Sequence, residues 1–459
     1  MLDAVAVSGA VSYYSNIGFR FAHLEWHFFM YVLYSALLAF FLTLTLPYWL
    51  LQMMRHGKYR AGLGQRFGAV PPALVYDRDK PAIWIHAVSV GEVVASSIVV
   101  EALRKKLPSH RVLISTTTST GQKLAAQRFG EGNVFYFPLD FAFAIRPYLD
   151  VLRPELVVVA ETEFWPNFLR LAKRSGARIA VINCRISDRS FPGYKRFRFW
   201  LPSLLETALR NVDCFLAQTE EDRRRLVEIG ADVTKIAVAG NLKFDVALPA
   251  SPKIVASLRE SFNRSGAEPV LVCGSTLEDE EGALLSTFRN ILVNRPKAVM
   301  ILAPRHPERF AEVAELIETL GFRMWRRSLW SGEPLTGGVF LVDTIGELAA
   351  IYSLATIAFV GGSLVPRGGH NILEPALYGV PIVTGNHYEN FRDVVNFFAS
   401  QNAVRIVGLA ELPLVFIELI ENSDERARLG RNALAALTSQ RGATERTISA
   451  LLQLMGNSS

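Results

Sequence analysis

From Pro81 onward, short apolar runs alternate with segments of helical pattern, and this alternation restricts the fold more than any other feature of the chain. The runs are AIWIHAV, RVLIST, LVVVAE, ARIAVIN, DCFLAQ and IAVAGNLKFD, and a second series follows with PVLVCGS, AVMILAP, GVFLVDT and TIAFVGGS. Strands that are apolar throughout are typical of parallel sheets with helices on both faces. The sequence therefore predicts an α/β fold with two facing, doubly wound, Rossmann-like domains.

The domain boundaries are predicted from a break in this alternation. Residues 247–258, ALPASPKIVASL, contain two prolines, and we place the interdomain linker there. We expect an N-terminal α/β domain over residues 55–248 and a C-terminal α/β domain over residues 249–430. Residues 431–459 are expected to form a helical segment that packs back on the body. Ligands of such sheets bind beyond the carboxyl ends of the strands, so the cleft between the domains is the expected site.

The stretch Phe28–Leu51 carries no charged residue. As a helix it would extend roughly 36 Å, enough for a hydrocarbon core of ~30 Å. Arg55 and further basic residues follow it, whereas few charges precede it, and the positive-inside rule then assigns the large C-terminal part to the cytoplasm. We expect residues 1–54 to hold an N-terminal extension and a membrane-anchor helix at about 28–51. A full span and a helix lying in the membrane interface are both compatible with the sequence.

Charge and cysteine usage exclude several classes of protein. The net charge of +6 indicates anionic partners, such as phosphorylated ligands or a membrane surface, without singling out nucleic acid. The three cysteines are far apart in the sequence and form no CxxC pair, so neither a disulfide framework nor a zinc ribbon is indicated. The chain also lacks GxxxxGK[ST], HExxH and GxSxG, which argues against P-loop, zincin and α/β-hydrolase functions.

A glycine-rich stretch, Phe359–Gly385, has the pattern strand, turn, short helix, strand. We expect the backbone N–H groups of its turn, and the N-terminus of its helix, to be free to face an anion. Glu374 lies early in that helix, where a carboxylate can accept hydrogen bonds from sugar hydroxyls. The alternative is an ordinary turn between a strand and a helix, with glycines for tight geometry.

Four polar clusters follow strands and contain the candidate functional residues. Glu92 of HAVSVGE would begin a helix, whose dipole keeps a carboxylate ionised as a general base requires. Glu161 of AETEFWPNF follows a strand, and Glu161 and Glu163 should diverge because residues two apart in an extended segment point apart. Lys243 of GNLKFD and Arg305 of APRHPERF are cations that can meet a phosphate. For each of these residues a structural or merely solvated role is the alternative.

One further segment, residues 185–201, interleaves basic and aromatic side chains in RISDRSFPGYKRFRFWL. Such interleaving can bind nucleic acid. Next to a membrane anchor it rather favours contact with lipid headgroups and acyl chains. A solvated helix face is the alternative.

Taken together and in this order, HAVSVGE, ETEFWPN, GNLKFD, APRHPERF, DTIGEL and FVGGSLVPRGGHNILEP resemble the motifs of the 3-deoxy-D-manno-octulosonic acid (Kdo) transferases of lipopolysaccharide assembly. The resemblance runs from about residue 50 to beyond residue 400. It implies the two-domain glycosyltransferase fold called GT-B, and inverting transfer of Kdo from CMP-Kdo to a lipid A precursor such as lipid IVA. The N-terminal domain would then bind the acceptor, and the C-terminal domain would bind CMP-Kdo. It also implies no cofactor and no required metal, contact with membrane lipids but not with nucleic acid, and a place on the cytoplasmic side of the inner membrane.

The resemblance also gives roles to individual residues. Glu92 resembles the family's catalytic base, and Glu161 and Lys243 resemble the positions assigned to transition-state stabilisation. The contacts to CMP would be Pro304, Arg305, Ile345, Gly346, Glu347, Asn371, Ile372, Leu373 and Glu374. Two alternatives stay open: another membrane-associated GT-B glycosyltransferase with a different sugar nucleotide and a lipid acceptor, and a membrane-tethered module that binds nucleotides or nucleic acid without catalysis.

Overall fold

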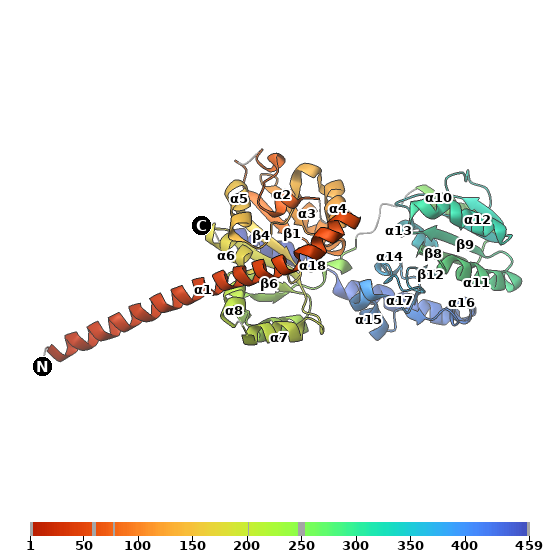
Figure 1. Cartoon of the computed structure of the whole chain (residues 1–459). Coiled ribbons are helices and arrows are strands. Elements are labelled where there is room, and N and C mark those ends of the chain that lie inside the picture. The colour runs from red at the N-terminus through yellow and green to blue at the C-terminus, as the bar shows by residue number, and fades with distance from the viewer. Residues whose placement is uncertain (1–2, 57–60, 77–78, 201, 247–252, 457–459) are drawn as a thin grey trace. The chain divides into compact units, whose positions relative to one another are not determined.

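The structure, a computed structural model, describes residues 3–56, 61–76, 79–200, 202–246 and 253–456. The chain divides into two compact units: unit 1 comprises Met1–Lys243 and Gly442–Ser459, and unit 2 comprises Phe244–Arg441. Each unit is a parallel sheet with helices on both faces (Figure 1). The predicted α/β class with two doubly wound domains is confirmed.

Unit 1 is built on a parallel sheet whose described strands run in the order β3-β2-β1-β4-β5-β6-β7. The strand order reverses between β1 and β4, and open α/β sheets bind their ligands at such a switch point. The strands are β1 (Ala82–His86), β2 (Arg111–Thr116), β3 (Val134–Tyr136), β4 (Pro154–Ala160), β5 (Arg178–Cys184), β6 (Cys214–Ala217) and β7 (Ile236–Val238). The helices are α2 (Leu63–Arg66), α3 (Val90–Lys106), α4 (Ser119–Phe129), α5 (Ala142–Leu152), α6 (Pro166–Arg174), α7 (Phe191–Trp200), α8 (Pro202–Arg210) and α9 (Glu220–Ile229).

Both faces of this sheet are closed by apolar packing. On one face Trp84 is fully buried against Phe168, with ring centroids 4.9 Å apart. On the other face Ile85 packs in one cluster with Leu451 of α18 (Ala443–Gly456). The last described helix therefore completes the core of unit 1, whereas α17 (Ser423–Gln440), which precedes it, belongs to unit 2.

Unit 2 repeats the architecture with the strand order β10-β11-β9-β8-β12-β13-β14, and its switch point lies between β8 and β12. The strands are β8 (Val270–Thr276), β9 (Val299–Pro304), β10 (Met324–Arg326), β11 (Gly338–Leu341), β12 (Ile357–Val360), β13 (Ile382–Gly385) and β14 (Arg405–Val407). The helices are α10 (Lys253–Ser265), α11 (Glu280–Asn294), α12 (Phe310–Thr319), α13 (Leu348–Ile351), α14 (Leu373–Ala376), α15 (Arg392–Ser400), α16 (Leu412–Glu421) and α17 (Ser423–Gln440).

Three details differ from the sequence-based expectation. Residues 247–252 of the predicted linker lie outside the described residues, and from Lys253 onward the chain is already helix α10. The segment expected over 431–459 is divided, because its first part ends α17 in unit 2 and its remainder forms α18 in unit 1. The edge strands β3, β10 and β14 were not predicted, since three residues are too few for a periodic pattern.

The N-terminal helix α1 (Asp3–His56) holds the stretch expected to anchor the chain. Within it Phe29–Arg55 is long and apolar enough to cross a membrane. Phe40, Phe41 and Leu44 in this stretch are 68%, 59% and 66% exposed. A large apolar surface on α1 is therefore left uncovered by the protein itself.

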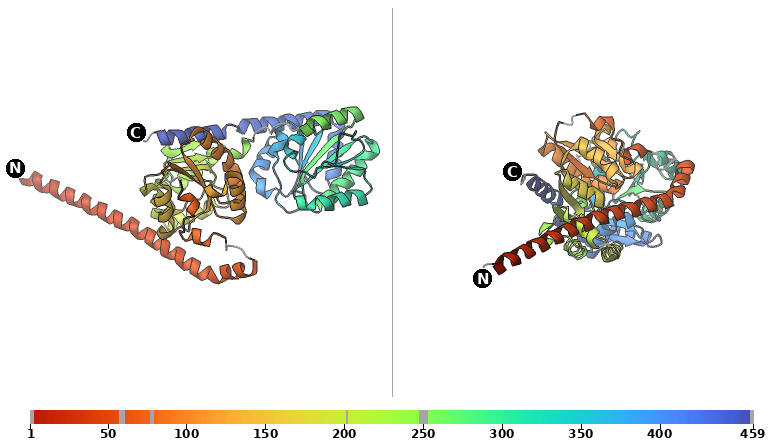
Figure 2. Two further views of the ribbon diagram at one scale, coloured as in Figure 1. Left: turned by 90° about the horizontal axis from the view of Figure 1, so that it is seen from above. Right: turned by 60° about the vertical axis from the view of Figure 1, so that its left-hand side comes forward.

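The beginning of the same stretch docks on unit 1 (Figure 2). Met30 and Tyr31 are buried in a small cluster with Leu204 of α8. The Nδ2 amide of Asn167, on α6, donates a hydrogen bond to the Ser35 hydroxyl at 3.0 Å. These contacts fix α1 beside α6 and α8.

Candidate functional site

Glu92 lies in the first turn of α3, directly after the switch-point strand β1, as the sequence predicted. The Ser89 hydroxyl caps the helix by accepting a hydrogen bond from the Glu92 N–H, and it donates to Glu92 Oε1 at 2.9 Å. Glu92 Oε2 accepts the Val88 N–H at 2.7 Å. This arrangement is a variant of the capping box, in which the acid accepts the N–H of the residue before the N-cap, and it holds the carboxylate in one orientation.

Burial raises the pKa of the Glu92 carboxyl group, and the nearby acids Glu161 and Glu163 add to this effect, whereas hydrogen bonds from the Val88 N–H and the Ser89 hydroxyl oppose it; the resulting pKa is about 7. The helix start therefore does not keep the carboxylate fully ionised, which corrects the sequence-based expectation: burial and like charge outweigh these hydrogen bonds. A carboxyl group that titrates near neutral pH is well suited to take up a proton from a substrate hydroxyl.

Glu161 follows β4 in a left-handed backbone conformation, with φ of 58°. Its N–H donates to the Ile182 carbonyl at 2.9 Å, so the turn is tied to the neighbouring strand β5. Non-glycine residues adopt this conformation at a cost, and it turns the chain sharply. The segment is therefore not extended as the sequence suggested at Glu161, and both Glu161 and Glu163 lie near enough to raise the pKa of Glu92.

Lys243 lies in the short turn of helix Leu242–Phe244, after β7 and at the end of unit 1. The Asn183 side chain, at the end of β5, accepts the Leu242 N–H at 3.0 Å and so positions this turn. The structure thus places Glu161 near Glu92 and fixes the backbone of the turn that carries Lys243.

In unit 2 a cation, an amide and a carboxylate lie together beyond β9 and β12. The N–H of the exposed Arg305 donates to the Thr276 carbonyl at 2.9 Å. The Asn371 amide nitrogen lies 3.5 Å from Glu374 Oε1. Burial raises the pKa of Glu374, whereas Asn371 and the Arg305 guanidinium lower it. This set can offer a positive charge to a phosphate and hydrogen bonds to hydroxyl groups.

The other predicted nucleotide contacts are arranged differently. Pro304, Ile372 and Leu373 are buried, so only their backbone groups are available to a ligand. Beyond β11, Ile345 is 79% exposed and Gly346 is also exposed. The Glu347 carboxylate accepts two hydrogen bonds from Arg327, at 3.0 and 2.8 Å.

The glycine-rich turn after β12 is bound by an acid from α11 that sequence reasoning missed. Glu280, fully buried at the start of α11, accepts the N–H groups of Leu277, Gly362, Ser363 and Leu364 at 2.7–2.9 Å. These backbone groups were expected to face a ligand anion, and that expectation is wrong because a carboxylate of the protein itself occupies them. The available signal was the acidic run after β8, in GSTLEDEE.

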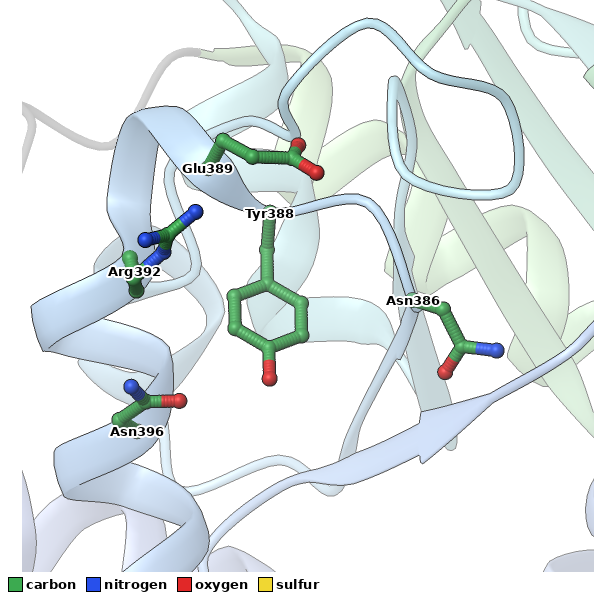
Figure 3. A pocket seen from close by; sticks show the side chains of 5 residues that line it. All are labelled: Asn386, Tyr388, Glu389, Arg392 and Asn396. Carbon is green, nitrogen blue, oxygen red and sulfur yellow. The ribbon is translucent and has the colours of Figure 1, made fainter.

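A polar opening of about 310 Å³ lies after β13 and was also missed. Its lining consists of Asn386, Tyr388, Glu389, Arg392 and Asn396. Figure 3 shows the Tyr388 ring pointing into the space between Asn386 and α15, from which Arg392 and Asn396 project. It borders the glycine-rich turn, since the Asn390 N–H donates to the Gly368 carbonyl at 2.9 Å.

The basic and aromatic segment forms α7 and the loop before it. Lys195 pairs with Glu228 and Arg198 with Glu206, so part of its positive charge is neutralised within the protein. Phe199 is 79% exposed. The remaining aromatic side chains of α7 that the structure describes are partly buried on the core of unit 1.

The chain is similar in sequence to a known family of enzymes. The family described as 3-deoxy-D-manno-octulosonic-acid transferase (kdotransferase) matches residues 61–246. The 3-deoxy-D-manno-octulosonic acid transferase of Haemophilus influenzae is 32% identical over 437 residues, 93% of this chain and 98% of that protein. The enzyme of the same description from Bordetella pertussis is 35% identical and aligns with 82% of this chain and 87% of its own length.

Solved structures of other proteins are also similar to this chain. The C-terminal CMP-Kdo binding domain of WaaA from Acinetobacter baumannii is 35% identical and covers 40% of this chain and 98% of that domain, with a TM-score of 0.38. UDP-GlcNAc 2-epimerase from Neisseria meningitidis is 14% identical with a TM-score of 0.50, covers 81% of this chain and all of that protein, and shows the fold alone. By the identity and coverage of its relatives, the chain belongs to the Kdo transferase family and is a glycosyltransferase.

Proposed function

We propose that the chain transfers Kdo from CMP-Kdo to a lipid A precursor, lipid IVA, with inversion at the anomeric carbon. Membership of the Kdo transferase family supports Kdo as the sugar that is transferred. The observation that carries the mechanism is the Glu92 carboxyl group, held by a capping box at the β1/β4 switch point with a pKa of about 7. Such a group can accept a proton at neutral pH, which glycosyl transfer to a hydroxyl requires.

In the proposed reaction Glu92 takes the proton of an acceptor hydroxyl while the oxygen attacks the anomeric carbon of Kdo. The bond from that carbon to the phosphate oxygen of CMP breaks, and CMP leaves with the bonding electron pair. A positioned base typically accelerates such a step by about 10²–10⁴-fold. Glu161, beside Glu92, would stabilise positive charge that develops on the sugar ring.

The departing phosphate needs positive charge, which we assign to Lys243 and Arg305 rather than to a required metal ion. Asn371–Glu374 would bind the nucleotide, with Glu374 accepting hydrogen bonds from hydroxyls. Ile345–Glu347 would contribute through the exposed turn after β11. The polar opening with Arg392 suits a hydroxyl-rich ligand that carries a carboxylate.

We further propose that α1 holds the enzyme at the inner membrane, with both α/β units on the cytoplasmic side. The exposed apolar side chains of Phe29–Arg55 support membrane contact. The basic residues that follow this stretch favour the anionic surface of the cytoplasmic leaflet, which supports this orientation.

The experiment is to incubate the full chain with lipid IVA and either CMP-Kdo or UDP-sugars, and to read the product mass. We expect addition of Kdo from CMP-Kdo alone. Glu92→Ala should lose transfer while CMP binding persists, and Glu101→Ala, at an exposed acid of the same helix, is the matched control. Transfer from a UDP-sugar, or salt-sensitive nucleic-acid binding without transfer, would refute the proposal.

A further inference from the structure

A second opening, of about 400 Å³, lies in unit 1 and takes no part in the chemistry described above. Its size is within the range of small-molecule sites. Apolar and aromatic side chains dominate its lining, among them Tyr34, Phe164, Trp165, Tyr194, Phe197 and Leu205. They come from α1, α7, α8 and the segment that leads into α6. A lining of this kind favours an aliphatic ligand over a sugar or nucleotide.

One side of this aromatic pocket is the candidate anchor helix. Tyr34 belongs to the turn of α1 that docks on unit 1 through Ser35 and Asn167. Directly beyond that turn the apolar side chains of α1 are exposed, Phe40 and Phe41 among them. A bilayer that covers these side chains therefore lies beside the pocket, and a lipid tail can enter without crossing water.

The other side of the pocket is continuous with the candidate catalytic acids. Phe164 and Trp165 directly follow Glu163 in the sequence. The Tyr194 hydroxyl donates to the Thr162 carbonyl at 3.0 Å, and its ring meets Phe164 edge to face at 5.9 Å. The pocket wall thus supports the same turn that places Glu161 and Glu163 near Glu92.

We propose that this pocket binds one acyl chain of the lipid acceptor. This inference rests on the proposed function, because it assumes that the acceptor is acylated. It goes further by identifying the site that binds the acyl chain. A chain seated between α1 and α7 leaves its sugar headgroup at the turn after β4, within reach of the proton acceptor Glu92. The pocket then selects acceptors that present an acyl chain from the membrane.

Gly193 offers a way to block the pocket without disturbing the helix. It lines the pocket on α7, and a Cβ added there meets no atom within 4 Å. Gly193→Leu would place an aliphatic side chain in the opening. Gly282→Leu is the matched control, since Gly282 is also helical and exposed, and its Cβ likewise meets nothing within 4 Å.

The first measurement is kinetic. We expect Gly193→Leu to raise KM for lipid IVA at least about tenfold and to leave kcat/KM for the deacylated disaccharide unchanged, whereas Gly282→Leu changes neither. An unchanged KM for lipid IVA in Gly193→Leu would overturn the inference. Equal loss with both acceptors would overturn it too, because the pocket would then serve the chemistry rather than the acyl chain.

The second measurement does not need transfer, so it separates this inference from the proposed function. Spin-labelled fatty acids of graded length should quench the tryptophan fluorescence of the full chain. The quenching that comes from Trp165, which lines the pocket, should be absent in Trp165→Phe. Each methylene withdrawn from the probe should weaken binding roughly fourfold. If Gly193→Leu is quenched as strongly as the unchanged protein, or if binding does not depend on chain length, the pocket does not hold acyl chains, whatever the enzyme transfers.

Discussion

Replacing Glu92 with glutamine tests both its role as a base and the origin of its raised pKa. Glutamine has the same shape, and its amide oxygen can accept the Val88 N–H while its NH₂ group donates to the Ser89 hydroxyl, so the capping box is retained. The amide cannot take up the proton of an acceptor hydroxyl. We therefore expect transfer to fall at least about a hundredfold, with the fold intact.

The effect of Glu92→Gln on stability depends on pH, and its size follows from the pKa. The carboxyl pKa rises from 4.5 to about 7 on folding. At 1.36 kcal/mol per unit, this difference corresponds to roughly 3 kcal/mol. Because the folded-state pKa is the higher one, the contribution is fully present below about pH 4.5 and is lost as the pH rises through about 7. The neutral amide does not ionise, so its contribution does not change with pH. The free energy of unfolding of the variant should therefore match that of the unchanged protein at low pH and exceed it by up to about 3 kcal/mol at about pH 8.

The assay is thermal unfolding of both proteins over this pH range, with transfer rates measured in parallel. Glu101→Gln, at an exposed position of α3, controls for the loss of a carboxylate on the same helix. A stability gap that stays constant with pH would refute burial as the cause of the raised pKa. A rate close to that of the unchanged protein would refute the assignment of Glu92 as the base.

Four further outcomes are expected. Glu161→Gln removes a carboxylate that raises the pKa of Glu92, so the acidic limb of the pH profile of kcat/KM should move to lower pH; an unmoved limb would contradict the proximity of the two acids. Glu280→Ala leaves two buried and two partly buried N–H groups unpaired, at about 1–3 kcal/mol for each buried one, so unit 2 should melt earlier and calorimetry should show weaker CMP binding; an unchanged melting temperature would contradict the role of Glu280 in holding the turn. Incubation with EDTA should leave the initial rate of transfer unchanged, and loss of activity restored by a divalent cation would show a metal requirement. Tags at the two ends of the chain should be labelled from the same side of the membrane, whereas labelling from opposite sides would show that α1 crosses it.

The fold could be predicted because parallel strands covered on both faces are apolar over their whole length. β4 from Leu156 onward and the whole of β12 show this pattern, and each is followed by a polar residue or a glycine turn. The edge strand β14 could not be found in this way, since it is only three residues long and half-buried at two of them. The position of α18 could not be predicted either, because an apolar helix face can pack on either of two similar sheets.

The site was predictable where its geometry is local. Ser89 and Glu92 have capping-box spacing, so the helix start could be located from the sequence. The raised pKa of Glu92 could not be predicted, because it depends first on burial, and then on acids that another strand and the left-handed turn at Glu161 bring near. The same holds for Glu280, whose partners Gly362 and Ser363 lie some eighty residues away in the chain.

The docking of α1 bears on whether the apolar stretch crosses the membrane. From Ser35 to Met54 the helix rises by about 28 Å, close to the thickness of a hydrocarbon core, so its length permits a crossing. Its beginning, however, is bound to unit 1 through Asn167, and the chain that follows it is bound to the same unit, where the Tyr136 N–H donates to Gln65 at 2.8 Å. A spanning helix has its two ends on opposite sides of the bilayer, whereas one folded unit lies on one side. We therefore expect α1 to lie along the membrane face, where the aromatic pocket beside it meets the lipid tails.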